Sequence, residues 1–156
     1  MITRFSHLGL AVKNMDEALH VWRDVCGLEV VEMKNYPEIG FRNAIMRVGD
    51  DVYIELMESP SSDTEIGHFL EKRGEGMYHI CLELDDIDKG LAELKAAGAD
   101  VLEIPASESV GGKRGFLRRR FMHGVLIELV GKSDMENWEV RKDFLKKKKP
   151  GKKPAK

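Results

Sequence analysis

Several short runs of the chain alternate apolar and polar residues, a pattern with a period of two that is typical of half-buried strands. The first run, SHLGLAV at 6–12, is followed by an apolar pattern of helical period in MDEALHVWRDV at 15–25, which we expect to end at Gly27. Three more strand-like runs come after Gly27: LEVVEMK, FRNAIMRVG and VYIELME. This part of the sequence therefore predicts the order strand, helix and three strands.

The same order of elements is written twice. SHLGLAVKNMDEAL at 6–19 aligns without a gap with YHICLELDDIDKGL at 78–91, and VYIEL at 52–56 aligns with VLIEL at 125–129. The second copy continues through a helical segment, DIDKGLAELKAAG, into the runs DVLEI, GFLRRRFM and VLIELV. The period is too long for a solenoid and fits a duplicated module of about 60 residues. We therefore predict an α+β fold made of tandem βαβββ modules.

The modules define the expected domain organisation. We predict a single domain over residues 1–135, with module one at 1–58, a connector with a short helix at 59–75 and module two at 76–131. The segment that follows, 136–156, ends in the low-complexity stretch RKDFLKKKKPGKKPAK, which has too few apolar residues to offset the entropy cost of ordering. We expect this Lys-rich tail to be disordered.

Charge and hydropathy limit the partners. Residues 141–156 hold nine Lys/Arg and one Asp, which leaves 16 Lys/Arg against 26 Asp/Glu, a net charge of -10, for residues 1–140. The basic tail has neither interleaved aromatic residues nor a recognisable nucleic-acid-binding fold, so we expect no specific nucleic-acid partner. No apolar stretch is long enough to span a membrane and the start of the chain shows no secretory signal, so we expect a cytoplasmic protein with no membrane partner. Cys26 and Cys81 are expected to be buried free thiols.

Four polar residues interrupt the apolar runs at positions related by the repeat: His7, Glu55, His79 and Glu128. Side chains at i and i+2 share a face of a strand, so each of the four lies opposite the apolar residues that pack on the helices. One such residue is usually structural. Two imidazoles and two carboxylates on one concave surface instead favour a site for a divalent metal ion such as zinc, cobalt, manganese, nickel or iron.

The run GFLRRRFM places three arginines next to each other in a predicted strand. Because neighbouring side chains alternate between the two faces, at least one of Arg118, Arg119 and Arg120 is expected to point towards the cavity. There it could meet a phosphate or a carboxylate. A solvated strand with paired charges is the alternative interpretation.

With these residues the sequence resembles the vicinal oxygen chelate superfamily over residues 3–131, and within it the methylmalonyl-CoA epimerases. The resemblance rests on SHLGLAV, IELME, FLEKRGEGMYHICLELDDI and HGVLIELV. It implies a fold in which the tandem modules form a concave metal-binding cavity. It also implies an acyl-CoA substrate, a homodimer and two catalytic bases, Glu38 in PEIGF and Glu128, on opposite faces of the substrate α-carbon. The metal ligands that it assigns are His7, Glu55, His79 and Glu128.

The function implied by the resemblance is a metal-dependent epimerase that interconverts the stereoisomers of methylmalonyl-CoA through a metal-stabilised enolate. Two other functions stay open. The same four ligands would serve a glyoxalase-type lactoylglutathione lyase, and related resistance-type proteins bind small molecules without catalysis. Four positions depart from the epimerase pattern: Ile39 stands where glutamine is usual, Tyr78 replaces a histidine, Glu55 stands where relatives can have glutamine, and RRRFM replaces a segment of the L-H-P-K type. The last of these bears most on the substrate.

Overall fold

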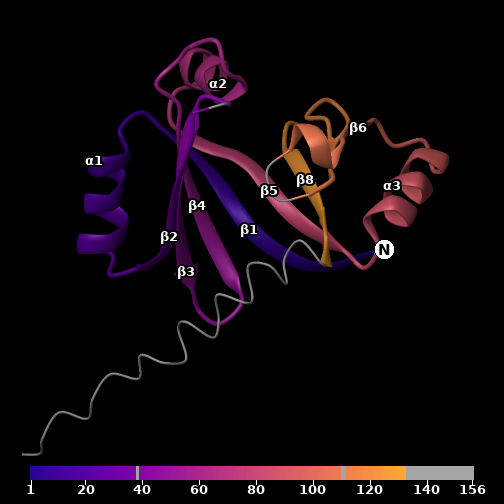
Figure 1. Ribbon diagram of the computed structural model, residues 1–156, viewed down its shortest axis with the longest axis horizontal. Helices are drawn as coiled ribbons and strands as arrows, with labels where there is room; N and C mark the ends of the chain where they lie inside the picture. The colour runs from indigo at the N-terminus through magenta and orange to yellow at the C-terminus, as the bar shows by residue number, and fades with distance from the viewer. Residues whose placement is uncertain (38, 110–111, 133–156) are drawn as a thin grey trace, which may run out of the picture.

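The computed structural model describes residues 1–37, 39–109 and 112–132 of the chain. The strands form one eight-stranded sheet in the order β2-β3-β4-β1-β5-β8-β7-β6 (Figure 1). In chain order the elements are β1 (Ile2–Val12), α1 (Met15–Leu19), the π-helix η1 (His20–Val25), β2 (Glu29–Tyr36), β3 (Phe41–Val48), β4 (Val52–Glu58), α2 (Glu65–Arg73), β5 (Gly76–Leu84), α3 (Ile87–Ala96), β6 (Val101–Ile104), the 3-10 turn η2 (Ala106–Glu108), β7 (Arg114–Leu117) and β8 (Leu126–Gly131).

The sheet consists of two similar halves that meet at its centre. β1 pairs parallel with β4 in the first half, β5 pairs parallel with β8 in the second, and the halves join through the antiparallel pair of β1 and β5. This pairing satisfies an edge that each module would otherwise expose. The α+β tandem βαβββ fold predicted from the sequence is confirmed, with one refinement. The two modules share a single curled sheet and do not form two separate sheets (Figure 1).

Each half buries the apolar residues of its strands under a helix. Met15 and Leu19 of α1 pack with Leu56 of β4 in one core, and Leu91 of α3 packs with Leu129 of β8 in the other. Figure 1 shows α1 and α3 on opposite sides of the molecule, both outside the curled sheet. The alternate side chains of the same strands therefore point to the other face, which we call the inner face.

The connector helix α2 closes one end of the inner face. The Thr64 hydroxyl caps the helix by accepting a hydrogen bond of 2.9 Å from the N–H of Gly67. Ile66 and Leu70 of α2 are buried in a third cluster with Ala11 of β1 and Met57 of β4. Ala11 stands four positions after His7 and Met57 stands two positions after Glu55, so Ala11 and Met57 share the inner face with those two residues.

The helix predicted over 15–25 is present, but it consists of an α-helical part and a π-helical part. It is α-helical from Met15 to Leu19 and continues as the π-helix η1 to Val25, where the N–H of Cys26 donates to the carbonyl of Val21 at 2.9 Å. An apolar period read from sequence does not distinguish these two hydrogen-bonding patterns. The prediction of two buried thiols is half wrong: Cys81 is buried, but Cys26, at the end of this helix, is exposed.

The strand predicted over GFLRRRFM was extended too far. β7 ends at Leu117, and the chain then turns, with the N–H groups of Phe121 and Met122 donating to the carbonyl of Arg118 at 2.9 and 3.1 Å. The turn continues through His123 and Gly124, whose φ values of 52° and 94° are incompatible with an extended strand. The three arginines therefore do not alternate across a sheet.

Two expectations about the ends of the chain remain predictions. The Lys-rich segment 136–156 lies outside the described residues, and the domain boundary at 135 lies there with it. Among the residues that the structure does describe, no helix is long and apolar enough to cross a membrane.

Candidate metal centre and active site

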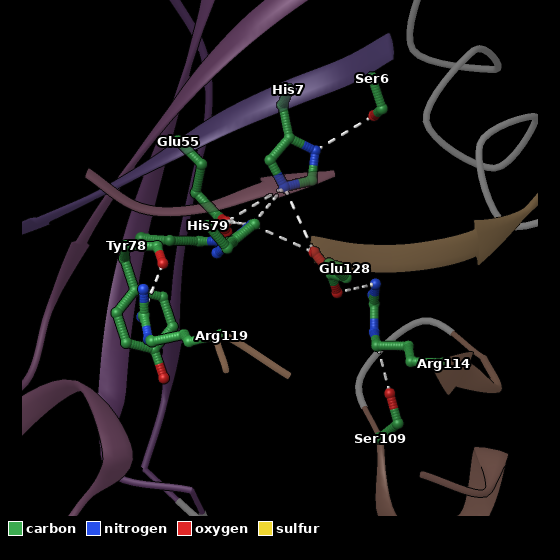
Figure 2. Close-up of polar contacts among 10 residues, drawn as sticks. Ser6, His7, Glu55, Tyr78, His79, Ser109, Arg114, Arg119 and Glu128 are labelled. Atoms are coloured by element: carbon green, nitrogen blue, oxygen red, sulfur yellow. Dashed lines mark hydrogen bonds and ion pairs between the residues drawn. The ribbon is translucent and has the colours of Figure 1, made fainter. Parts of the chain in front are cut away.

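The structure brings the four repeat-related polar residues together on the inner face (Figure 2). They stand on the four central strands of the sheet, and all four are buried. The residues are His7 on β1, Glu55 on β4, His79 on β5 and Glu128 on β8. Glu38, the other predicted catalytic residue, lies outside the described residues.

The side chains converge through one atom each. The Nε2 atoms of His7 and His79 are 3.0 Å apart. The Oε2 atom of Glu55 lies 3.4 Å from His7 Nε2 and 3.7 Å from His79 Nε2. The Oε2 atom of Glu128 lies 3.5 Å and 3.1 Å from the same two nitrogens. Two histidines from different modules thus face each other, with a carboxylate of each module beside them.

These donors fit a first-row divalent ion. Ligands held at about 2.1 Å from such an ion are about 3 to 3.5 Å from their neighbours, close to the spacings observed here. Within the described chain, His7, His79 and Glu128 form a group whose donor atoms all lie within 4.8 Å of one another, with Glu55 adjoining it. Burial by itself lowers the pKa of His7, but the neighbouring Cys81 sulfur and the two carboxylates raise it well above its ordinary value. The centre therefore favours positive charge.

Glu128 is held by an arginine that the sequence analysis did not single out. Arg114 Nη1 donates to Glu128 Oε1 at 2.5 Å, and Arg114 Nε donates to the hydroxyl of Ser109 at 2.9 Å (Figure 2). Burial opposes ionisation of Glu128, but Arg114 and the two histidines lower its pKa well below the ordinary value. The oxygen that faces the histidines, Oε2, is thus the one left to bind an ion.

Glu55 has a neutral partner in place of an arginine. Asn43 Nδ2 on β3 donates to Glu55 Oε1 at 2.6 Å, so that Oε2 again faces the histidines. Burial opposes ionisation here too, while hydrogen bonding and charge from His7 keep the pKa of Glu55 below its ordinary value. Each carboxylate therefore has one oxygen fixed by a partner on the neighbouring strand and one oxygen turned to the centre.

The histidines are positioned by small residues and by irregular pairing. The Ser6 hydroxyl is 3.1 Å from His7 Nδ1, which orients that ring. Gly9 stands directly against the His79 ring, and a Cβ at Gly9 would overlap it. In contrast, Nδ1 of His79 is buried and has no hydrogen-bond partner among the described residues.

The three consecutive arginines separate into two groups. Arg118 and Arg120 pair with Asp100, at 3.8 and 2.7 Å, away from the centre. Arg119 instead donates from Nη2 to the carbonyl of Tyr78 at 2.7 Å, next to His79 (Figure 2). One arginine of the three is therefore near the site, for a reason that differs from the predicted strand alternation.

The residues that the sequence analysis missed occupy repeat-related positions as well. Asn43 lies opposite Met57, two residues after Glu55, and Arg114 lies opposite Val130, two residues after Glu128. In the sequence, each of them is a polar residue near the start of the strand that precedes VYIEL or VLIEL and pairs with it. Their relation to the glutamates becomes visible only when the register between the strands is known.

Comparison with known proteins places the chain in a family. Residues 6–121 match the Glyoxalase/Bleomycin resistance protein/Dioxygenase superfamily, and the chain belongs to it. The observed fold, two tandem βαβββ modules with a cluster of histidines and glutamates on the inner face, agrees with this family assignment.

Similar proteins narrow the comparison further. The mitochondrial methylmalonyl-CoA epimerase of Mus musculus is 34% identical, over 81% of this chain and 71% of its own length. An ethylmalonyl-CoA/methylmalonyl-CoA epimerase of Cereibacter sphaeroides is also 34% identical, over 83% and 98%. Among solved structures, a variant of the Streptomyces coelicolor methylmalonyl-CoA epimerase in complex with 2-nitronate-propionyl-CoA matches with a TM-score of 0.76 and 31% identity, over 84% of this chain and 98% of that chain.

Proposed function

We propose that this protein is a metal-dependent epimerase that inverts the α-carbon of methylmalonyl-CoA. The observation that carries the proposal is the convergence of two histidines and two glutamates on the four central strands, in a chain whose relatives are named methylmalonyl-CoA epimerases. His7, His79 and Glu128 would hold the ion, with Glu55 as the fourth ligand. When bound, a divalent ion supplies Lewis-acid stabilisation of the negative charge that develops on the substrate oxygens.

The protein's own residues then move the proton. Inversion at carbon requires one group on each face of the substrate: a carboxylate takes the α-proton as the C–H bond breaks, and a carboxylic acid on the other face returns a proton. We assign these roles to Glu128 and Glu38. For one stereoisomer, Glu128, ionised beside Arg114, accepts the α-proton and Glu38 donates a proton to the other face. That turnover leaves Glu128 protonated and Glu38 ionised, which is the state in which Glu38 accepts and Glu128 donates for the other stereoisomer.

Exchange of the α-proton with solvent tests the proposal. Wild-type protein loaded with a divalent ion should incorporate deuterium from D2O into methylmalonyl-CoA, as followed by mass spectrometry. Chelation should stop the exchange, and returning the ion should restore it. Absence of exchange together with turnover of a glutathione hemithioacetal would instead support the glyoxalase-type alternative. Absence of both reactions would leave the non-catalytic, small-molecule-binding alternative.

The Glu38→Gln variant tests the second base separately from the metal. We expect it to keep its ion and to lose turnover by at least about 100-fold, which is the order of general acid/base catalysis. Metal content should be measured on the same preparation. An active Glu38→Gln variant would remove this residue from the mechanism.

Two further expectations also belong to the proposal. We propose a homodimer, which light scattering of the purified protein would test, and a cytoplasmic location, which imaging of the tagged protein would test. The native metal is to be identified by elemental analysis of protein purified without added ions.

A further inference from the structure

Two arginines stand apart from the rest in the described part of the chain. Every other arginine there forms an ion pair with a carboxylate, as do Arg114, Arg118 and Arg120 described above. Arg73 and Arg119 form none within 4.0 Å among the described residues. In an acidic body, two arginines without carboxylate partners indicate that their charge is used for something else.

The two arginines lie on the same aromatic ring although they are far apart in sequence. The guanidinium carbon of Arg119 is 5.1 Å from the Phe69 ring centroid and that of Arg73 is 6.0 Å from it. Arg119 also stacks on Tyr78, at 5.2 Å. Cation–π contact stabilises each guanidinium, but bringing two like charges to one ring costs free energy that a bound anion would recover.

The geometry leaves hydrogen-bond donors available. A guanidinium has five N–H groups in a planar fork, and Arg119 uses Nη2 for the carbonyl of Tyr78. Arg73 is exposed at the last turn of α2. Planar guanidinium forks match phosphate oxygens better than the point charge of a lysine does.

This pair lies at the edge of the candidate metal centre. Tyr78 is the residue before His79, and their ring centroids are 5.7 Å apart. In the β1–β5 pairing, Gly9 faces His79 and Leu10 faces Met77, so Tyr78 is the extra residue of a β-bulge. The bulge allows Tyr78 to reach Phe69 of α2 while its neighbour His79 points into the centre, as Figure 2 shows for Tyr78, His79 and Arg119.

We propose that Arg73 and Arg119 form an anion-binding site that takes a phosphate group of the CoA moiety of the substrate. The inference rests on the proposed epimerase function and deepens it. Residues 1–140 carry a net charge of -10, so a polyanionic thioester meets repulsion over most of this surface and needs a local cationic site. The pantetheine arm is flexible, which lets its phosphate end fold onto the rim formed by α2 and the turn after β7.

Substrates with fewer phosphates test this assignment. The α-proton exchange should be measured with methylmalonyl-CoA, with methylmalonyl-dephospho-CoA, which lacks the 3′-phosphate, and with methylmalonyl-pantetheine, which lacks all phosphates. We expect Arg119→Ala and Arg73→Ala each to raise KM for methylmalonyl-CoA about 5-fold to 10-fold, with kcat nearly unchanged, as for loss of one charge-assisted hydrogen bond. For methylmalonyl-pantetheine the variants and the wild type should have equal KM values.

The same variants identify the phosphate. If the dephospho substrate behaves like the pantetheine substrate, the pair binds the 3′-phosphate, and if it behaves like the full substrate, the pair binds the pyrophosphate. Arg118→Ala and Arg120→Ala, in the same turn but paired with Asp100, are the matched controls and should leave KM for all three substrates unchanged. Arg119→Lys keeps the charge and is included in case Arg119→Ala lowers the thermal stability through loss of its contact with Tyr78.

Two outcomes would overturn the inference. One is an equal rise of KM for all three substrates, which would assign the arginines a structural role. The other is equal affinity of wild type and of both alanine variants for CoA itself, measured by calorimetry. The calorimetric experiment needs no turnover, so it tests the phosphate site even if the exchange assay shows that the proposed epimerase function is wrong.

Discussion

The two halves of the sheet present the same pair of side-chain types, a histidine and a glutamate, but support them differently. Asn43 and Arg114 occupy equivalent positions on β3 and β7, and each donates to the Oε1 atom of the glutamate in its own half. A neutral amide therefore fixes Glu55, whereas a guanidinium fixes Glu128. The geometry of the two halves is the same, and the difference in the charge of the partner is what makes the two carboxylates chemically unequal.

The histidines show a second difference between the halves. Ser6 and Tyr78, the residues that precede them, are both extra residues in the irregular β1–β5 pairing. The Ser6 hydroxyl lies within hydrogen-bond distance of His7 Nδ1. In contrast, Nδ1 of His79 has no hydrogen-bond partner among the described residues, and the Tyr78 ring packs against the His79 ring in a T-shaped arrangement. The first histidine is held by a hydrogen bond and the second by packing.

The largest effect should come from exchanging each glutamate for glutamine. We expect Glu128→Gln to lower α-proton exchange by at least about 1,000-fold, because on the proposed assignment the variant loses both a charged ligand and a base. Glu55→Gln keeps an oxygen donor and loses only ligand charge, so we expect a loss of about tenfold. Kinetics and metal content of the two variants are to be compared directly. Equal losses would show that the halves are chemically equivalent after all.

The two cores should respond alike. Leu56 and Leu129 are both fully buried and occupy equivalent positions on β4 and β8. We expect Leu56→Ala and Leu129→Ala each to lower the free energy of unfolding by about 3 kcal/mol, measured by urea denaturation without metal. If the two losses differ by more than about 1 kcal/mol, the two halves differ in core packing as well as in the partners of their glutamates.

Removing the partners of the glutamates separates charge from hydrogen bonding. Arg114→Met leaves a buried carboxylate without its cation and should destabilise the metal-free protein by about 2 kcal/mol or more, whereas Asn43→Leu should cost about 1 kcal/mol. Addition of a divalent ion should raise the melting temperature of Arg114→Met more than that of wild type, since the ion replaces the lost positive charge. A smaller rise than in wild type would contradict a compensating role for Arg114.

The smallest effects concern Gly9 and Cys81, the residues that pair with the two histidines where β1 and β5 meet. Gly9 lies against His79, and its counterpart Cys81 pairs with His7 across β1 and β5. Gly9→Ala should displace the His79 ring and weaken metal binding about tenfold, as followed by a chelator competition titration. Burial raises the pKa of the Cys81 thiol to about 11, so the thiol stays neutral. Cys81→Ala should therefore change the affinity for the metal ion about twofold or less. A loss for Cys81→Ala as large as for Gly9→Ala would make the thiol part of the centre.

Periodicity and the repeat were sufficient for much of this structure. Alternation in VYIEL and VLIEL placed Glu55 and Glu128 on the inner face, because a half-buried strand has only two faces and the apolar one is fixed by its helix. The alignment of His7 with His79 then predicted that both modules contribute to one site. These were local patterns, and local patterns are what a single sequence carries.

The remaining features depend on contacts between distant segments. Strand register determines the β1–β5 pairing, the bulges at Ser6 and Tyr78, and the placement of Asn43 and Arg114 beside the glutamates. No single strand specifies its own register. The turn after Leu117 was missed because the alternation in GFLRRRFM does not show that the backbone turns at Arg118, where the N–H groups of Phe121 and Met122 donate to one carbonyl.

The pairing of β1 with β5 also explains why the centre needs both halves of the chain. A single module carries one histidine and one glutamate, which is half of the donor set, and the antiparallel β1–β5 pair brings the two halves together. Because both halves belong to one chain, equivalent positions need not hold the same residue, as Asn43 and Arg114 show.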